Sequence, residues 1–253
     1  MTTDERAVYE SLAESYGQSL SGYHYFVKVA TENPLAHLGL RAYWGMNELA
    51  GVNIPDISKN GFTGTLKPTP PGDCPLPVSS KNAKFGSALN FDHIDDDIEF
   101  TTIVISRLNA SFSLWFKTKT NFSTNYNNIA ALLSYTGVAS RYFGIAGNGS
   151  GPYTLIGECN TNGHIMCNVA GIVPVGKWNH VLVNFSTGTA TTYLNNVLVG
   201  TRAIISDFSP GRIGGITEVG GNNYFGGQMD EIRIYNRPLG ATERTKLFRL
   251  FSR

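Results

Sequence analysis

The stretch SFSLWFKTK at residues 111–119 alternates between apolar and polar side chains with a period of two. Phe112, Leu114 and Phe116 fall on one face of an extended chain, and most of the polar side chains fall on the other. Because successive side chains of a β-strand point to opposite faces of its sheet, this stretch predicts a strand with one face in a core.

Similar short stretches follow along the chain and are separated by turn residues rather than by long helices. They include HVLVNFS at 180–186, TTYLNNVLVG at 191–200 and DEIRIYN at 230–236. Many short strands in this arrangement are typical of two antiparallel sheets packed face to face. We therefore predict an all-β fold, an antiparallel β-sandwich, in a domain spanning residues 38–253 that ends in a short helix after Pro238.

Residues 1–37 are predicted to form a separate N-terminal helical arm. Thr2 and Glu5 have the spacing of a capping box, and the apolar residues that follow recur at helical intervals before Gly17. A single short helix is unstable unless it packs against another surface. The arm therefore either covers an edge of the following domain or docks onto a partner, such as another copy of the chain or a capsid or tail.

The charge of the chain argues against several classes of function. Twenty Lys and Arg residues oppose 19 Asp and Glu residues, and charged residues make up only 15% of the chain. Nucleic-acid binding requires a basic surface, which this balance does not supply, so we expect no nucleic-acid partner. No apolar run approaches the roughly 20 residues of a transmembrane helix, so we expect no membrane span.

The N-terminal residues are acidic and polar and do not have the pattern of a secretory signal. We expect synthesis in the cytoplasm, followed by a location on a virion surface or outside the cell after release. The cysteines agree with a reducing compartment. Cys159 and Cys167 flank an Asn-Gly turn, and a two-residue loop there would place Cys159 opposite Met166, so we predict no disulfide between the two thiols.

Five phrases, in order along the chain, resemble the concanavalin A-like, laminin-G-like jelly-roll domains. The resemblance implies a jelly-roll sandwich but does not decide the function, because this fold serves lectins, adhesion modules, hydrolases and structural proteins. The phrases are YWGMNELAG (43–51), DISKNGFTGTL (56–66), GSALNFDHIDDDIEF (86–100), GKWNHVLVNF together with TTYLNNVLVG (176–200), and FGGQMDEIRIYNRPLGATE (225–243).

The resemblance also implies a structural Ca²⁺ site between the first turn and the closing strand. The matching positions are Asp56, Asn60 and Asp230, with backbone carbonyls near Gly64. Calcium prefers such oxygen ligands, and a carboxylate at the edge of a core must be hydrogen-bonded or bound to a cation. The alternative is that Asp230 accepts hydrogen bonds from the amides of the 56–64 turn.

The stretch DDDIEF at 95–100 resembles the catalytic strand of jelly-roll β-glucanases. A period of two puts Asp95, Asp97 and Glu99 on one face, with Asp95 in the nucleophile position and Glu99 in the acid/base position. Retaining hydrolysis needs two carboxyl groups about 5–5.5 Å apart, and the short Asp side chain upsets that spacing. We therefore expect a protein without catalytic activity and keep a glycoside hydrolase as an alternative.

Aromatic side chains combined with amides in the predicted loops are suited to binding sugars. We predict a lectin-like module that binds a glycan or cell-surface ligand and is displayed on a surface, such as a virion decoration or fibre protein. A calcium-dependent carbohydrate-binding or adhesion protein without a virion role is the alternative. The predicted ligand-binding residues are Tyr126, Tyr142, Tyr153, Asn222, Asn223 and Tyr224.

Overall fold

The described strands all lie in the unit of residues 39–239, and the C-terminal residues 240–250 belong to a separate unit. The predicted N-terminal arm, residues 1–37, lies outside the residues that the structure describes. The structure is a computed structural model that describes residues 38–47, 49–67, 75–78, 83–119, 129–136, 141–147, 152–159, 165–216 and 223–250.

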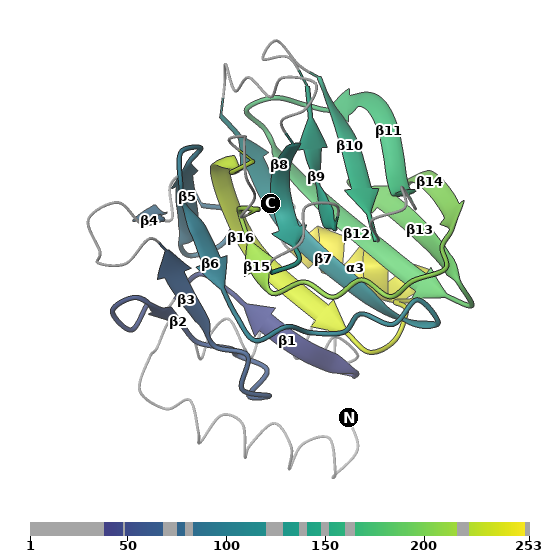
Figure 1. The fold of residues 1–253 in the computed structure, drawn as a ribbon, viewed down its shortest axis with the longest axis horizontal. Helices are drawn as coiled ribbons and strands as arrows, with labels where there is room; N and C mark the ends of the chain where they lie inside the picture. The colour runs from purple at the N-terminus through teal and green to yellow at the C-terminus, as the bar shows by residue number, and fades with distance from the viewer. Residues whose placement is uncertain are drawn as a thin grey trace. The chain divides into compact units, whose positions relative to one another are not determined.

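The described residues of the unit 39–239 form two antiparallel sheets of eight strands each, here called sheet A and sheet B (Figure 1). The predicted antiparallel β-sandwich is therefore confirmed. Sheet A has the order β14 (Val197–Ala203), β13 (Thr189–Leu194), β12 (Trp178–Ser186), β7 (Asn109–Thr118), β16 (Gly226–Tyr235), β5 (Ala88–Asp92) and β4 (Leu76–Val78), with β1 (Leu40–Trp44) also paired to β16. Sheet B has the order β11 (Ile165–Val173), β10 (Tyr153–Glu158), β9 (Tyr142–Ala146), β8 (Ile129–Ser134), β15 (Arg212–Ile213), β6 (Asp97–Glu99), β3 (Gly64–Lys67) and β2 (Asn53–Ile54).

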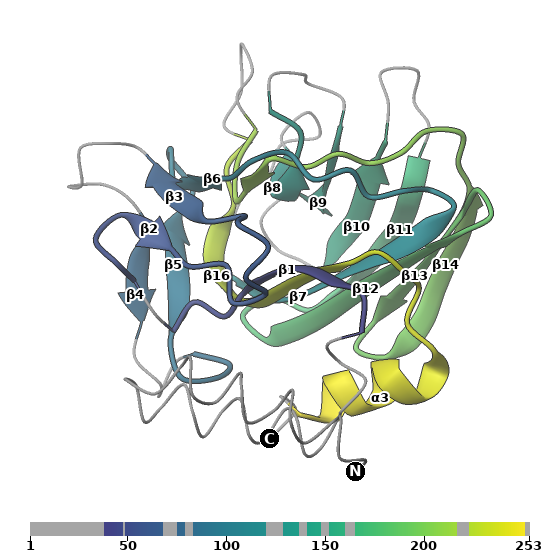
Figure 2. The ribbon, with the colours of Figure 1, turned by 90° about the horizontal axis from the view of Figure 1, so that it is seen from below.

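The main hydrophobic core lies between the two sheets, which Figure 2 shows as stacked layers. Strand β7 runs through the middle of sheet A between β12 and β16. Its predicted inner residues, Phe112, Leu114 and Phe116, are fully buried in this core. The opposite face of β7 is buried as well, since Trp115 packs against the ring of His180, with the ring centroids 5.0 Å apart.

The predicted C-terminal helix is confirmed as α3 (Ala241–Leu250). The backbone amide of Gly240 donates to Oε2 of Glu243 over 2.9 Å, which satisfies one of the free amides at the start of the helix. Among the described residues, no helix has the length and apolar composition that a membrane crossing requires.

The hairpin of β10 and β11 is confirmed, but its predicted register is wrong. Gly157 pairs with Cys167 and Glu158 with Ile165, so the pairing shifts by one residue just before Cys159. The shift comes from an irregularity within the strands. A register predicted from an ideal two-residue turn assumes regular pairing along both strands and therefore misses it. Cys159 and Cys167 are both buried, and they form no disulfide with each other, as predicted.

Candidate functional site

A row of polar side chains crosses the outer face of sheet B. Residues that lie directly opposite each other on neighbouring strands point to the same face of a sheet. Ile98 and Ile213, the strand neighbours of two members of the row, point into the core, so the row faces away from it. The row, here called the polar row, consists of Thr65, Glu99, Arg212, Ser134, Tyr142 and Glu158, each paired with the next.

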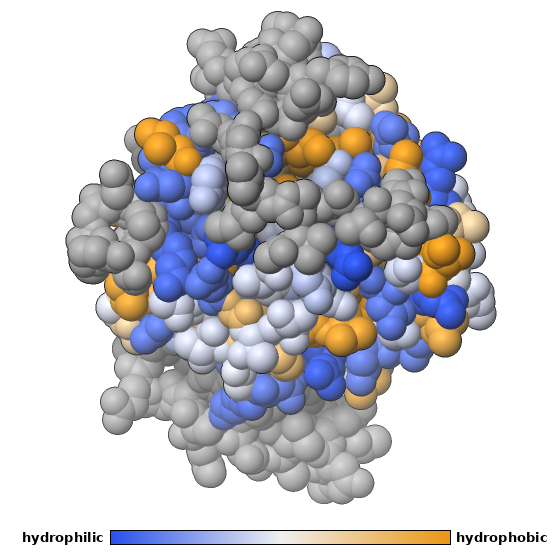
Figure 3. Space-filling model, viewed as in Figure 1, coloured by the Kyte–Doolittle hydropathy of each residue, from blue (hydrophilic) through white to orange (hydrophobic). Residues whose placement is uncertain are grey.

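Arg212 forms ion pairs with two carboxylates at the charged end of the polar row. Its Nη1 lies 2.5 Å from Oδ2 of Asp97, and its Nη2 forms an ion pair with Oε1 of Glu99. Lys67 lies 3.4 Å from the other Glu99 oxygen. The side chains of Arg212 and Asp97 are 7% and 2% exposed, whereas that of Glu99 is 35% exposed. Glu99 and Lys67 are therefore the parts of this cluster that solvent and ligands reach; in Figure 3, hydrophilic atoms gather over β3 and β6.

Burial raises the pKa of Asp97 to about 6, and the nearby Arg212 opposes this rise by stabilising the carboxylate. The other carboxylate of β6, Glu99, adds to the rise because it repels a second negative charge. Asp97 is therefore a buried anion that depends on Arg212 for its charge balance.

The other half of the polar row is less charged. Tyr142 and Glu158 are hydrogen-bonded to each other through their side chains, and burial raises the pKa of both groups. Tyr142 also belongs to a second, smaller hydrophobic cluster. The outer face of sheet B thus combines a charged half with an apolar half. The members of the smaller cluster are Ala131, Tyr142 and Ile216, with Ile129 and Ile156 packed against them.

The segment that carries Asn223 and Tyr224 lies against this face. The carbonyl of Asn223 accepts a hydrogen bond from the amide of Ala131 on β8 over 3.4 Å. A Cβ atom added to Gly215 would lie 2.7 Å from the Tyr224 ring and 3.0 Å from Cβ of Asp97, so both side chains pack on this glycine. Burial, followed by the charge of Asp97, raises the pKa of Tyr224. The structure therefore brings three predicted ligand residues, Tyr142, Asn223 and Tyr224, to the polar row.

Two of the predicted ligand residues do not lie in loops, contrary to expectation. Tyr142 begins β9 with an exposed fraction of 4%, and Tyr153 begins β10 with an exposed fraction of 0%. Tyr153 is part of the core between the sheets because strand alternation turns it inward together with Leu155. It offers no surface to a ligand. Tyr126 and Asn222 lie outside the described residues.

Two members of the predicted calcium set, Asp56 and Asn60, organise the turn that follows β2. Oδ1 of Asp56 accepts hydrogen bonds from the amides of Tyr43 and Ser58, each over 3.0 Å, and Oδ2 accepts from the amide of Phe62 over 3.1 Å. The side-chain amide of Asn60 donates to backbone carbonyls of β1. Both side chains thus connect the turn to its own backbone and to the neighbouring strand.

The third member, Asp230, is fully buried on β16 in sheet A. Its Oδ2 accepts a hydrogen bond from the amide of Phe85 over 2.8 Å, while its Oδ1 is buried without a hydrogen-bond partner. Burial and the charge of Glu231 raise the pKa of Asp230. The amide donor therefore comes from outside the 56–64 turn. Asp230 and Asp56 have no hydrogen-bond donor in common, and calcium binding stays a prediction.

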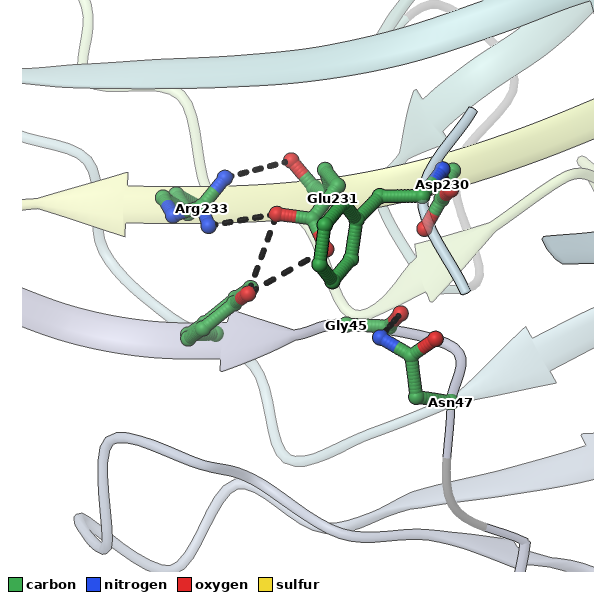
Figure 4. Close-up of polar contacts among 7 residues, drawn as sticks. Gly45, Asn47, Asp230, Glu231 and Arg233 are labelled. Atoms are coloured by element: carbon green, nitrogen blue, oxygen red, sulfur yellow. Dashed lines mark hydrogen bonds and ion pairs between the residues drawn. The ribbon is translucent and has the colours of Figure 1, made fainter. Parts of the chain in front are cut away.

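The neighbouring Glu231 faces away from Asp230 (Figure 4). It has a positive φ of 57° at a break in the β16 register, and this turns its carboxylate toward Arg233 and Tyr43. The ion pair with Arg233 measures 2.5 Å, and the Tyr43 hydroxyl donates to both carboxylate oxygens, over 3.0 and 3.2 Å. All three side chains are buried, so this network ties β1 to β16 rather than presenting charge to a ligand.

The predicted glucanase-like strand is only partly formed. Asp97 and Glu99 share a face of β6, as expected, but Asp95 lies before the strand. Its carboxylate instead groups with those of Asp92 and Asp96, with one oxygen of each within 4.8 Å of the others. The strand begins only at Asp97, later than the sequence pattern indicates, because a turn precedes it. Asp95 therefore does not occupy the expected nucleophile position.

Comparison with known protein families gives a match over more than half of the chain. The model of a family described as the concanavalin A-like lectin/glucanases superfamily matches residues 92–243. No curated protein sequence matches the chain.

Several solved structures share the fold. Domain 4 of AbnA, a GH43 extracellular arabinanase from Geobacillus stearothermophilus in complex with arabinotriose, is 19% identical with a TM-score of 0.61, over 82% of this chain and 97% of that one. The binding domain of Paraclostridial Mosquitocidal Protein 1 is 15% identical with a TM-score of 0.58, over 83% of this chain and 52% of that one. Trypanosoma rangeli sialidase in complex with sialic acid is 12% identical with a TM-score of 0.56; 83% of this chain aligns, to only 32% of the sialidase.

Proposed function

The chain belongs to the concanavalin A-like lectin/glucanases superfamily, and on this premise we propose that it is a carbohydrate-binding module without catalytic activity. The observation that carries the proposal is the position of Tyr224, whose partly exposed ring packs beside Asp97 at the charged half of the polar row. Binding sites for small ligands combine aromatic surface with a few well-placed polar groups. Tyr224 supplies a ring, Glu99 lies near enough for its charge to act on the Tyr224 hydroxyl, and Lys67 pairs with Glu99.

The ion pairs of β6 support a role in binding rather than hydrolysis. A glycoside hydrolase needs one protonated carboxyl group and one ionised carboxylate, both in reach of the substrate. Asp97 has the raised pKa of a proton donor, but it is 1% exposed and cannot reach a sugar. Glu99 is accessible, yet its carboxylate oxygens are already engaged in ion pairs with Arg212 and Lys67.

We further propose that the module is displayed on a surface, such as that of a virion, through its N-terminal segment. The capping-box pattern and the helical spacing of apolar residues in this segment support the idea, because a single short helix needs a surface to pack against. Deletion of residues 1–37 is expected to abolish assembly into a particle and to leave glycan binding intact. Loss of glycan binding together with assembly would contradict this division of roles.

A glycan array with the purified chain tests the function. Arabino-oligosaccharides and sialylated glycans are the first ligands to include, since similar structures contain arabinotriose or sialic acid. We expect binding to a defined set of glycans and no release of reducing sugar from β-glucan. An array without signal would contradict the binding role, and turnover that disappears in Glu99→Gln would contradict the absence of catalysis.

The same array in EDTA tests the calcium alternative. If Asp56, Asn60 and Asp230 hold a calcium ion that binding requires, chelation abolishes the signal. If the contacts of these side chains to the backbone hold the site without an ion, the signal persists in EDTA. That result would show that glycan binding does not require calcium.

A further inference from the structure

A cleft of about 370 Å³ opens at the edge of the sandwich where β1 begins and β16 ends. It shares no residue with the polar row. Its volume lies within the usual range for small-molecule sites. The residues that line it are Arg41, Thr102, Ile103, Val104, Ser106, Asn109, Ala110, Tyr235 and Asn236.

Arg41 is the positively charged residue among those that line this cleft. The pairing of β1 with β16 shifts between Leu40 and Ala42, so Arg41 occupies an irregularity of the strand and is exposed. Such bulges redirect a side chain out of the regular strand pattern and are common next to functional sites. The guanidinium lies over the ring of Phe62, with Cζ 5.6 Å from the ring centroid, and within the described part of the chain no carboxylate pairs with it.

The turn that follows β2 holds the backbone of Arg41 in place. The hydroxyl of Ser58 and the side-chain amide of Asn60 each donate to the carbonyl of Arg41 over 3.0 Å. Asp56 fixes the same turn to the next residues of β1 through the amide of Tyr43. Asp56 and Asn60, two residues of the predicted calcium set, therefore also hold the backbone around Arg41.

The remaining walls of the cleft are uncharged. Thr102, Ser106, Asn109 and Asn236 present hydroxyl or amide groups, and the side-chain amide of Asn109 donates to the carbonyl of Asn236 over 3.2 Å. Val104 is 64% exposed at the margin. The floor is closed by side chains that are almost fully buried, namely Ile103, Ala110 and Tyr235.

We propose that this cleft binds a sugar unit that carries a carboxylate, such as a uronic or sialic acid. The planar guanidinium of Arg41 binds the carboxylate through two parallel hydrogen bonds, which is the geometry that arginine favours. Asn109 and Ser106 bind the hydroxyl groups of the sugar, and Val104 contacts its apolar face. A simple anion fills little of the volume and leaves these neutral groups without a role. This second site is separate from the one beside Tyr224.

Isothermal titration and amide NMR with glucuronic acid and N-acetylneuraminic acid as probes test the proposal. We expect both acids to shift the amide resonances of residues 41, 102–109 and 236, and glucose and sodium sulfate to shift them much less. Arg41→Ala is expected to weaken binding about tenfold or more, because a charge-assisted hydrogen-bond pair is lost. Arg41→Lys keeps the charge but loses the paired geometry and is expected to weaken binding by a smaller factor.

Arg202→Ala, which removes an exposed arginine of β14, is the matched control and is expected to bind like the wild type. Thermal melting of each variant verifies that it is folded. Equal binding of glucose or sulfate, or unchanged binding by Arg41→Ala, would overturn the proposal. The shifts of residues 41, 102–109 and 236 report on this cleft alone, whereas Tyr224→Ala tests the site of the proposed function, so failure of one site is distinguishable from failure of the other.

Discussion

Arg212 on β15 lies directly opposite Glu99 on β6, and its guanidinium pairs with the Glu99 carboxylate on the outer face of sheet B. The same guanidinium also holds the buried carboxylate of Asp97, two residues earlier on β6. One side chain thus neutralises two carboxylates and connects two short strands. The candidate carbohydrate site is built beside this connection.

Replacing Arg212 by Met is expected to destabilise the protein by about 3 kcal/mol, because breaking a buried ion pair leaves the Asp97 charge uncompensated. Urea unfolding at pH 7 measures the change in the free energy of unfolding. Arg202→Met, at an exposed position of β14, is the control and is expected to change it by less than about 0.5 kcal/mol. Similar values for the two variants would show that the ion pairs contribute little.

The stability of the protein is expected to respond to the protonation of Asp97. Its pKa is about 6 in the folded state and near the ordinary 3.8 in the unfolded state, so the folded protein binds the proton more tightly. This contribution is fully present below about pH 4 and is lost as the pH rises through about 6, by up to about 3 kcal/mol. At pH values well above 6, the contribution of Asp97 to the free energy of unfolding no longer changes with pH.

Asp97→Asn lacks this titration and serves as the reference for it. The difference in unfolding free energy between wild type and Asp97→Asn is expected to change across this pH window and to be flat above it. Carboxyl ¹³C NMR gives the midpoint of the Asp97 titration directly. A midpoint at the ordinary value of 3.8 would contradict the structural account of its burial.

Gly227 on β16 is expected to tolerate no side chain. Its φ is +142°, and a Cβ there would overlap the backbone carbonyl of Lys117 on the paired strand β7. Gly227→Ala is therefore expected to destabilise the protein by about 3 kcal/mol. Gly200→Ala is the matched control, because its Cβ would meet only Val169 at 3.4 Å. Equal melting temperatures for the two variants would disprove the predicted clash.

The sequence predicted those features that depend on neighbours in the chain. The alternation around Phe112 identifies β7 and its core face. Asn195 and Asn196, within the stretch TTYLNNVLVG, have the left-handed backbone of a turn, with φ values of 51° and 66°. His180, which lies in the predicted strand HVLVNFS, is 1% exposed on β12. Burial lowers its pKa to about 3, so it stays neutral in the folded protein.

The features that the sequence did not predict depend on residues distant in the chain. Arg212 is separated from Glu99 by 113 residues, and only the pairing of β15 with β6 brings them together. Tyr153 is predicted to lie in a loop, whereas the pairing of β10 with β11 makes it a strand residue that faces the core. Register across a sheet is a tertiary property that no single strand encodes.

The binding affinity of Tyr224→Ala for the strongest glycan ligand is the most direct test of the proposed carbohydrate site. Truncating the ring removes the aromatic surface beside Asp97 and is expected to weaken binding about tenfold or more, measured by isothermal titration calorimetry at pH 7. Tyr193→Ala, at a partly exposed tyrosine of β13 in the other sheet, is expected to bind like the wild type. Equal affinity of Tyr224→Ala and wild type, with both proteins folded, would contradict the account.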